Sequence, residues 1–192
     1  MTTFNYPADI TFLIVPGLRD HVEEHWQTHL ARQLPKSVAV PPLEHDKLSR
    51  AVRVEALNNT LASIEGPVLI IAHSAGCITT VHWALQNAQQ AGRIQAALLV
   101  TPADVENAMP ADYPTVDQLQ SNGWAPIPRQ PLPFKTQVAA SRNDPLAQFT
   151  RIEGLAADWR ASLVDLGEVG HLNPAGGYGP WDGVHALLQQ LV

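Results

Sequence analysis

The sequence predicts an α/β fold in which a mostly parallel sheet of about six strands carries helices on both faces. Short apolar runs rich in β-branched residues alternate along the chain with segments whose apolar residues recur at helical spacing. Near-continuous hydrophobicity in several of the runs is typical of strands that are covered on both faces. This β-α-β-α order favours parallel strands joined by right-handed crossovers, and therefore a three-layer α-β-α sandwich.

The individual elements follow from the same two patterns. The expected strands are the apolar runs at residues 10–15, 37–40, 68–72, 94–100, 136–140 and 162–166. The expected helices, each with one apolar face, are residues 26–34, 54–64, 78–88, 152–159 and 184–191. In a parallel sheet of this kind, functional groups gather at the carboxyl ends of the strands.

The length of 192 residues fits a single domain, and no break in composition divides the chain. Residues 101–133 form a long, proline-rich connection. A structureless loop of that length is usually functional, so we expect residues 103–133 to form a cap over the site, with room for a short helix.

Charge and composition exclude several classes of protein. The chain has 18 acidic and 12 basic residues and no run of Lys or Arg, which argues against nucleic acid or an anionic membrane as the main partner. Its single cysteine rules out an intramolecular disulfide. Residues 1–10 lack a secretory signal, and no apolar run approaches the about 20 residues of a membrane span. We therefore expect a cytoplasmic monomer or homodimer.

The motif AHSAG at residues 72–76 follows an expected buried strand and precedes an expected helix. This is the context of a nucleophile elbow, a tight turn that lifts a serine hydroxyl above the edge of the sheet. Ala72 and Gly76 are small enough for the turn to close. The pentapeptide alone arises by chance in roughly one chain in ten of this length, but its context favours Ser74 as a nucleophile.

The same turn directs the first amides of the following helix at the reacting centre. The Ala75 N–H is therefore expected to donate to an oxyanion. A second donor is expected from the loop after the first strand, where we favour the Leu18 N–H and where Gly17 lets the backbone come close. His73 cannot easily turn its ring onto the neighbouring hydroxyl, so we expect it to line the substrate cleft.

An acid and a histidine should follow the serine in that order. Asp144, in the motif SRNDP, follows an expected strand and is the favoured acid, with Asp104 and Asp112 as weaker candidates. An alternative role for Asp144 is the N-cap of the helix that follows. His171 lies in the glycine-bracketed sequence GEVGHLN after the last expected strand, and we expect it to be the general base.

His21, His25 and His29 recur every four residues and would stack three imidazoles on one helix. Zinc sites rarely take all their ligands from one helix, and the chain has no HExxH motif. Metal ligation is therefore the weaker interpretation of this repeat, and we expect neither a metal nor another cofactor.

Other reactive or aromatic side chains have simpler expected roles. Cys77 is expected to be a small buried residue rather than a second nucleophile. His45 and His185 have no motif around them and are expected at the surface. Four aromatic residues could either shape an apolar pocket or pack in the core, namely Trp124, Phe134, Tyr178 and Trp181.

Several motifs spread over the whole chain carry a resemblance to a known family. They are VPGL at 15–18, EHWQ at 24–27, AHSAGC at 72–77, PADVE at 102–106, SRNDP at 141–145, GHLN at 170–173 and GPW at 179–181. With them the chain resembles the small serine hydrolases typified by retinoblastoma-binding protein 9. The resemblance implies the α/β-hydrolase fold and a triad at Ser74, Asp144 and His171. Ala75 and residues 19–21 depart from the family pattern beside the oxyanion hole, which bears on the shape of the substrate.

The expected chemistry is acyl transfer from a small-molecule ester, thioester or amide to a serine, followed by hydrolysis. The main alternative is a protein-binding module on a hydrolase scaffold, with vestigial or weak activity, because a fold alone does not establish a function. A hydrolase that uses Cys77 or a metal is a further alternative.

Overall fold

The computed structural model describes residues 4–192 and contains a six-stranded sheet with the order β2-β1-β3-β4-β5-β6. The strands are β1 Thr11–Val15, β2 Ser37–Ala39, β3 Val68–His73, β4 Ile94–Val100, β5 Lys135–Ala140 and β6 Ser162–Asp165. Every neighbouring pair is parallel, which confirms the predicted fold class. Because the strands all run the same way, their carboxyl ends meet at one edge of the sheet.

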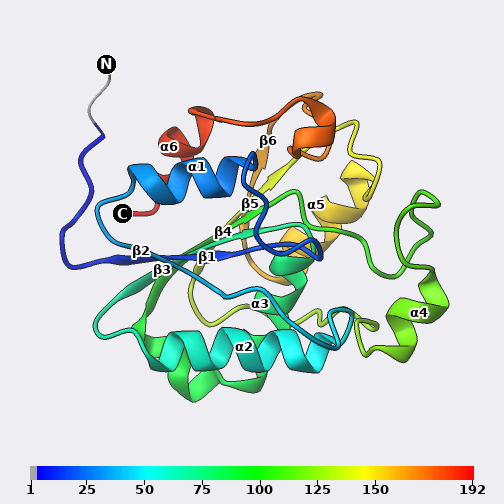
Figure 1. Ribbon diagram of the computed structural model, residues 1–192, viewed down its shortest axis with the longest axis horizontal. Helices are drawn as coiled ribbons and strands as arrows, with labels where there is room; N and C mark the ends of the chain where they lie inside the picture. The colour runs from blue at the N-terminus through cyan, green and yellow to red at the C-terminus, as the bar shows by residue number, and fades with distance from the viewer. Residues whose placement is uncertain (1–3) are drawn as a thin grey trace.

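Helices cover both faces of the sheet (Figure 1). The α-helices are α1 Trp26–Gln33, α2 Arg50–Ala62, α3 Ala75–Gln86, α4 Val116–Ser121, α5 Phe149–Asp158 and α6 Gly183–Leu188, with short 3₁₀ helices at Ala88–Arg93 and Pro174–Gly176. α1 and α6 pack on one face, and α2, α3 and α5 pack on the other. Within residues 4–192, no helix is long and apolar enough to cross a lipid bilayer.

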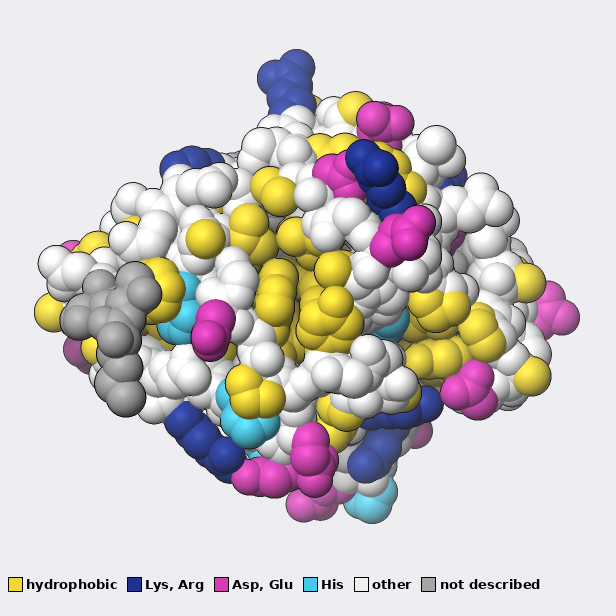
Figure 2. Space-filling model, turned by 90° about the horizontal axis from the view of Figure 1, so that it is seen from above, with side chains coloured by type: hydrophobic (Ala, Val, Ile, Leu, Met, Phe, Trp, Pro, Cys, Tyr) yellow, Lys and Arg dark blue, Asp and Glu magenta, His cyan; other side chains and the backbone are white. Residues whose placement is uncertain are grey.

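Alternate side chains of each central strand enter opposite apolar clusters. Leu13 and Ile70 pack with α2, α3 and α5, whereas Phe12 and Ile71 pack with α1 and α6, and all four side chains are fully buried. Burial on both faces explains why these strands are apolar almost throughout. Seen from the side of α1 and α6, apolar side chains gather near the centre of the surface and charged ones lie mostly toward its margin (Figure 2).

The long connection between β4 and β5 contains the short helix α4, which begins at a capping box formed by Thr115 and Gln118. Beyond α4, the connection packs against the body of the protein. The buried Trp124 donates its indole N–H to the Leu48 carbonyl at 2.7 Å, and Trp159 of α5 donates to the Pro128 carbonyl at 2.8 Å. This second half therefore serves as packing over α2, α3 and α5.

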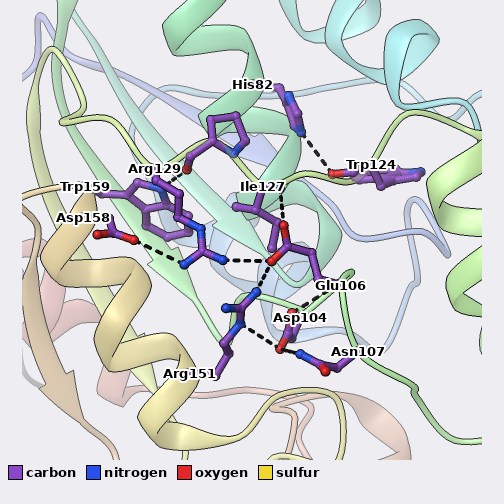
Figure 3. A network of polar contacts seen from close by, with 11 residues as sticks. His82, Asp104, Glu106, Asn107, Trp124, Ile127, Arg129, Arg151, Asp158 and Trp159 are labelled. Atoms are coloured by element: carbon purple, nitrogen blue, oxygen red, sulfur yellow. Dashed lines mark hydrogen bonds and ion pairs between the residues drawn. The ribbon is translucent and has the colours of Figure 1, made fainter.

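A network of ion pairs ties the connection to α5 (Figure 3). Glu106 contacts Arg151 and, at 2.8 Å, Arg129, while its other carboxylate oxygen accepts the Ile127 N–H at 2.7 Å. Asp104 pairs with Arg151 at 3.1 Å. One glutamate thus joins both halves of the connection to the helix that follows β5.

Candidate active site

Ser74 lies between β3 and α3 with φ 56° and ψ −125°, a conformation that residues other than glycine rarely adopt. Its amide donates to the Val100 carbonyl at 3.1 Å, which ties the turn to β4. A Cβ atom on Gly76 would lie 2.4 Å from the Val15 carbonyl oxygen and 2.6 Å from that of Pro16. The close approach of α3 to the end of β1 therefore requires glycine at this position, and the residues form the strand-turn-helix that the motif predicts.

Ser74, His171 and Asp144 form one hydrogen-bonded relay. The Nε2 atom of His171 lies 2.9 Å from the Oγ of Ser74, and its Nδ1 lies 2.8 Å and 3.0 Å from the two carboxylate oxygens of Asp144. The side chains of His171 and Asp144 are 4% and 3% exposed. With the proton on Nδ1 shared with the carboxylate, Nε2 is free to accept the serine proton. The loops after β3, β5 and β6 thus bring together residues far apart in the sequence.

The carboxylate of Asp144 makes one further contact, since its Oδ1 accepts the Leu146 N–H at 2.8 Å. α5 begins at Phe149, after the N-cap residue Gln148, so the alternative of Asp144 as the N-cap of this helix is wrong. The carboxylate instead closes the turn before the helix while it holds the imidazole. Asp144 can therefore accept hydrogen bonds from both the His171 ring and the Leu146 N–H, and it does not also have to cap a helix.

Asn143 orders the loop that carries the histidine. Its Oδ1 accepts the Gly170 N–H at 2.6 Å and the hydroxyl of Ser141 at 2.9 Å, and the Ser141 oxygen in turn accepts the Val169 N–H at 3.2 Å. Sequence reasoning did not single out Asn143, although it lies beside the expected acid in the SRNDP motif. The polar side chains of Ser141 and Asn143, which precede Asp144 in this motif, are the sequence feature that could have indicated a role in ordering the loop.

Three imidazoles lie in a row through the site. The rings of His25 and His73 have centroids 4.6 Å apart, and those of His73 and His171 are 4.9 Å apart. His73 donates its Nε2–H to the His171 carbonyl at 2.9 Å. Burial, with a smaller contribution from His171, lowers the pKa of His25 to about 4 and the pKa of His73 well below its ordinary value. The rings of His25 and His73 are therefore neutral near pH 7.

His21, His25 and His29 do not share one helix. α1 begins at Trp26, so His21 lies outside it, and His25 is its N-cap, whose Nδ1 accepts the Gln27 N–H at 3.2 Å. Across the described residues, 4–192, no group of three His, Cys, Asp or Glu side chains is placed to hold a metal ion.

The side chains of the remaining candidate acids and of the cysteine take no part in the relay. Asp104 is buried against Arg151, and Asp112 forms an exposed pair with Arg19 at 3.5 Å. Cys77 is fully buried, and burial raises the pKa of its thiol well above the ordinary value. Cys77 is therefore a packing residue without a reactive thiolate.

A cavity of about 170 Å³ lies beside the hydroxyl of Ser74. The predicted residues Gly17, Leu18, His73 and Ala75 line it. Its other lining residues are largely apolar: Val22, Ala103, Val105, Met109, Tyr113, Leu146, Pro174 and Ala175, together with Arg19, Asp20, His25, Gln27, Asn173 and the relay residues Ser74 and His171. The first part of the 103–133 connection thus contributes to the cavity wall.

The four aromatic residues that could have formed a pocket pack elsewhere. Trp124 and Phe134 belong to the cluster with α2, α3 and α5, and Tyr178 and Trp181 pack with α1 and α6. None of the four lines the cavity beside Ser74. The alternative of core packing therefore holds for all of them.

The loop after β1 passes directly beside the serine. A Cβ atom on Gly17 would lie 3.1 Å from the Cβ and 3.5 Å from the Oγ of Ser74. Within residues 4–192 the Leu18 amide has no hydrogen-bond acceptor. Ala75 is the first residue of α3, and the first amides of a helix have no partner inside it. Both amides that the sequence singled out are therefore free to donate to a bound group.

Comparisons with known proteins identify the family and the fold of the chain. The family model described as "Serine hydrolase" matches residues 12–190. A YdeN-like hydrolase from Pectobacterium atrosepticum is 32% identical, with 95% of this chain and 90% of that chain covered and a TM-score of 0.76. The ydeN gene product of Bacillus subtilis is 18% identical, with 95% and 98% covered and a TM-score of 0.74.

More distant structures share the fold. The RedJ thioesterase of Streptomyces coelicolor is 14% identical, with 100% of this chain and 96% of that chain covered and a TM-score of 0.68. No sequence match to a curated protein is found. The α/β-hydrolase fold is thus shown, and because the family model spans nearly the whole chain, the chain belongs to the serine hydrolase family.

Proposed function

We propose that the protein hydrolyses an ester, thioester or amide of a small acyl group through an acyl-enzyme on Ser74. The observation that carries this proposal is the buried relay, in which one imidazole lies 2.9 Å from the serine oxygen and 2.8 Å from a carboxylate. General acid–base and nucleophilic catalysis require hydrogen-bond distances of this kind between nucleophile, base and orienting acid. The strained turn at Ser74 supports the proposal, because such strain is typical of functional sites.

In the proposed mechanism, the Oγ of Ser74 attacks the carbonyl carbon as Nε2 of His171 takes its proton. The Leu18 and Ala75 amides stabilise the resulting oxyanion, and Asp144 stabilises the imidazolium. Collapse of the tetrahedral intermediate transfers the proton from His171 to the leaving group. A water molecule, deprotonated by the same imidazole, then attacks the acyl-enzyme and releases the acid.

The cavity favours a small apolar acyl group. An engineered apolar cavity of about 150 Å³ holds one benzene molecule, so about 170 Å³ has room for an acyl chain of a few carbons. Val105, Met109 and Leu146 supply apolar wall, while Tyr113 adds an aromatic surface. A panel of p-nitrophenyl esters of increasing acyl length, together with aminoacyl amides, tests this preference. We expect kcat/KM to decline steeply for long acyl chains.

Labelling with a fluorophosphonate probe tests the nucleophile. We expect stoichiometric labelling of the folded protein, loss of both labelling and turnover in Ser74→Ala, and unchanged labelling in Cys77→Ala. Absence of labelling in well-folded protein would favour a protein-binding role for this scaffold. Labelling that persists in Ser74→Ala would assign the reaction to another residue.

A further inference from the structure

Arg53, on α2, forms several hydrogen bonds with the loop that follows β1. Its Nη1 donates to the Gly17 carbonyl at 3.2 Å, and its Nη2 donates to the Leu18 carbonyl at 3.0 Å. Nη1 also lies 3.0 Å from a carboxylate oxygen of Asp20, and Nε donates to the Lys47 carbonyl at 2.7 Å. A single guanidinium therefore holds two successive carbonyls and the carboxylate of one short loop.

The contact between Arg53 and the Gly17 carbonyl contributes to the direction in which the Leu18 amide points. The Gly17 carbonyl and the Leu18 N–H belong to the same planar trans peptide group, so they point in opposite directions. With its oxygen held by Arg53, this peptide turns its N–H away from α2. The Gly17 carbonyl also accepts the Asp20 N–H at 3.1 Å. Arg53 therefore adds a side-chain contact to a turn in which Gly17 has no side chain of its own to restrict the backbone.

Arg53 acts on this loop from outside the cavity. Gly17 and Leu18 line the cavity, whereas Arg53 lies behind them and lines a separate, smaller space beneath the loop. The guanidinium also polarises the peptide groups whose carbonyls it binds. When a peptide carbonyl accepts a hydrogen bond, the N–H of the same peptide group becomes a stronger donor. These contacts favour an amide that is oriented before any substrate binds.

The arginine is deeply buried for a charged residue. The side chains of Arg53 and Asp20 are each 7% exposed, and Lys47 lies 3.8 Å from the same carboxylate. Burial lowers the pKa of Arg53, and Asp20 opposes this shift. A buried cation is tolerated when a counter-charge and hydrogen bonds satisfy it, and both are supplied here by the loop itself.

We propose that Arg53 is a positioning residue for acyl transfer, which fixes the Gly17–Leu18 peptide so that the Leu18 N–H faces the oxyanion, with Asp20 as its counter-charge. This inference rests on the proposed function, because it assigns a role to a donor of the proposed oxyanion hole. The inference requires that loss of the guanidinium raise the free energy of the transition state much more than that of the bound substrate.

Replacement of Arg53 by Met tests the role, because Met keeps most of the aliphatic stem and removes the guanidinium. We expect kcat for a short-chain p-nitrophenyl ester to fall roughly 10- to 100-fold, somewhat less than the loss of a whole oxyanion-hole donor, while KM stays within about twofold. Affinity for an alkyl trifluoromethyl ketone, whose hemiketal oxygen occupies the oxyanion hole, should fall by about the same factor as kcat. Arg53→Lys should recover part of both.

Arg93 offers a matched control at the opposite edge of the sheet. It too donates to several backbone carbonyls of one segment, those of Leu61 and Gly66 at 3.2 Å and 3.3 Å and that of Ile64, but it lies just before β4 and far from the serine. Arg93→Met should lower the melting temperature and leave kcat and the ketone affinity unchanged.

The outcomes separate this inference from the proposed function. Wild-type kcat in folded Arg53→Met, or equal losses of kcat in the Arg53 and Arg93 variants, would overturn the role of Arg53 while Ser74-dependent turnover stands. Turnover that survives Ser74→Ala would instead overturn the proposed function itself. Should Arg53→Met fail to fold, the same kcat and ketone measurements on Arg53→Lys decide the question.

Discussion

The imidazoles of His73 and His25 lie in a row beside His171. Burial lowers the pKa of both His25 and His73, so both rings are neutral near pH 7. His73 also holds the His171 backbone through its hydrogen bond to the carbonyl. The row therefore orients the proposed base without adding a cation beside it.

The proposed base has to be neutral, and this predicts the pH dependence of turnover. We expect kcat/KM for a p-nitrophenyl ester to fall as the pH is lowered from about 8 to about 5, because a protonated imidazole cannot take the serine proton. His25→Asn should retain this acid limb, which would show that the limb does not arise from His25. A flat profile over the same range in the wild-type protein contradicts the role of His171.

The lowered pKa of His25 predicts a pH-dependent stability. Its pKa falls from 6.5 to about 4 on folding, so between these values the unfolded state binds more protons than the folded state. The free energy of unfolding should therefore decrease as the pH falls from about 6.5 to about 4, by up to roughly 3 kcal/mol from this residue.

Comparison with His25→Asn isolates this contribution. Asn cannot titrate but is a favourable N-cap, so it can replace the acceptor that His25 offers to the Gln27 N–H. Denaturant unfolding at a series of pH values should show a shallower acid decline in the variant. Parallel curves for the two proteins would refute the assignment.

At the scale of the elements, α3 approaches the end of β1 so closely at Gly76 that there is no room for a side chain. A methyl group on Gly76 would meet two backbone carbonyl oxygens, which cannot move aside as a side chain can. Gly76→Ala should therefore lower the free energy of unfolding by roughly 3 kcal/mol, measured by urea denaturation. It should also reduce turnover, because α3 carries the Ala75 amide.

Gly154 provides the control for Gly76. It lies inside α5, and a Cβ atom there would have no neighbour within 4 Å. Gly154→Ala should stabilise the protein by about 1 kcal/mol, the gain in helix propensity. Equal effects of the two substitutions would contradict the steric account of the elbow.

The periodicity of the sequence predicts the strands more closely than the ends of the helices. The apolar run at 68–72 matches β3, Val68–His73, because a strand buried on both faces is apolar along its whole length. The apolar spacing at 54–64 starts later than α2, Arg50–Ala62. The first three residues of α2, 50–52, are partly or fully exposed, so no apolar spacing marks them. The start of the helix is instead set by Ser49, whose hydroxyl accepts the Val52 N–H.

The relay residues could be predicted because each follows a strand in a motif of recognisable chemistry, but Arg53 could not. Its partners are backbone carbonyls 35 and 36 residues away, whose positions depend on the path of the chain and on no side-chain pattern. For the same reason, the surface position expected for His185 is wrong. The residue is 5% exposed, and its ring lies between the Tyr6 hydroxyl at 2.7 Å and Gln33 at 2.8 Å.

At the scale of the whole molecule, Glu106 links the cavity wall to α5 through its network of arginines (Figure 3). Glu106→Gln keeps the shape of the side chain and removes its charge, so both ion pairs weaken. We expect faster hydrogen exchange in residues 103–113 and a loss of about 1 kcal/mol of stability, since the network is only partly exposed.

Arg32→Gln is the control for this network. It breaks a single exposed pair with Glu23 on the surface near α1. We expect it to leave both the melting temperature and the exchange of residues 103–113 unchanged, because isolated surface pairs contribute little. Exchange that is unaltered in Glu106→Gln would show that packing alone holds this wall in place.

The topology also separates the proposed nucleophile from its base by 97 residues of chain. During synthesis on the ribosome, the serine emerges long before the histidine that would activate it. A nascent chain that has not reached residue 171 therefore carries an ordinary alcohol, and the relay can form only after the segment with Asp144 and His171 has been made and has folded.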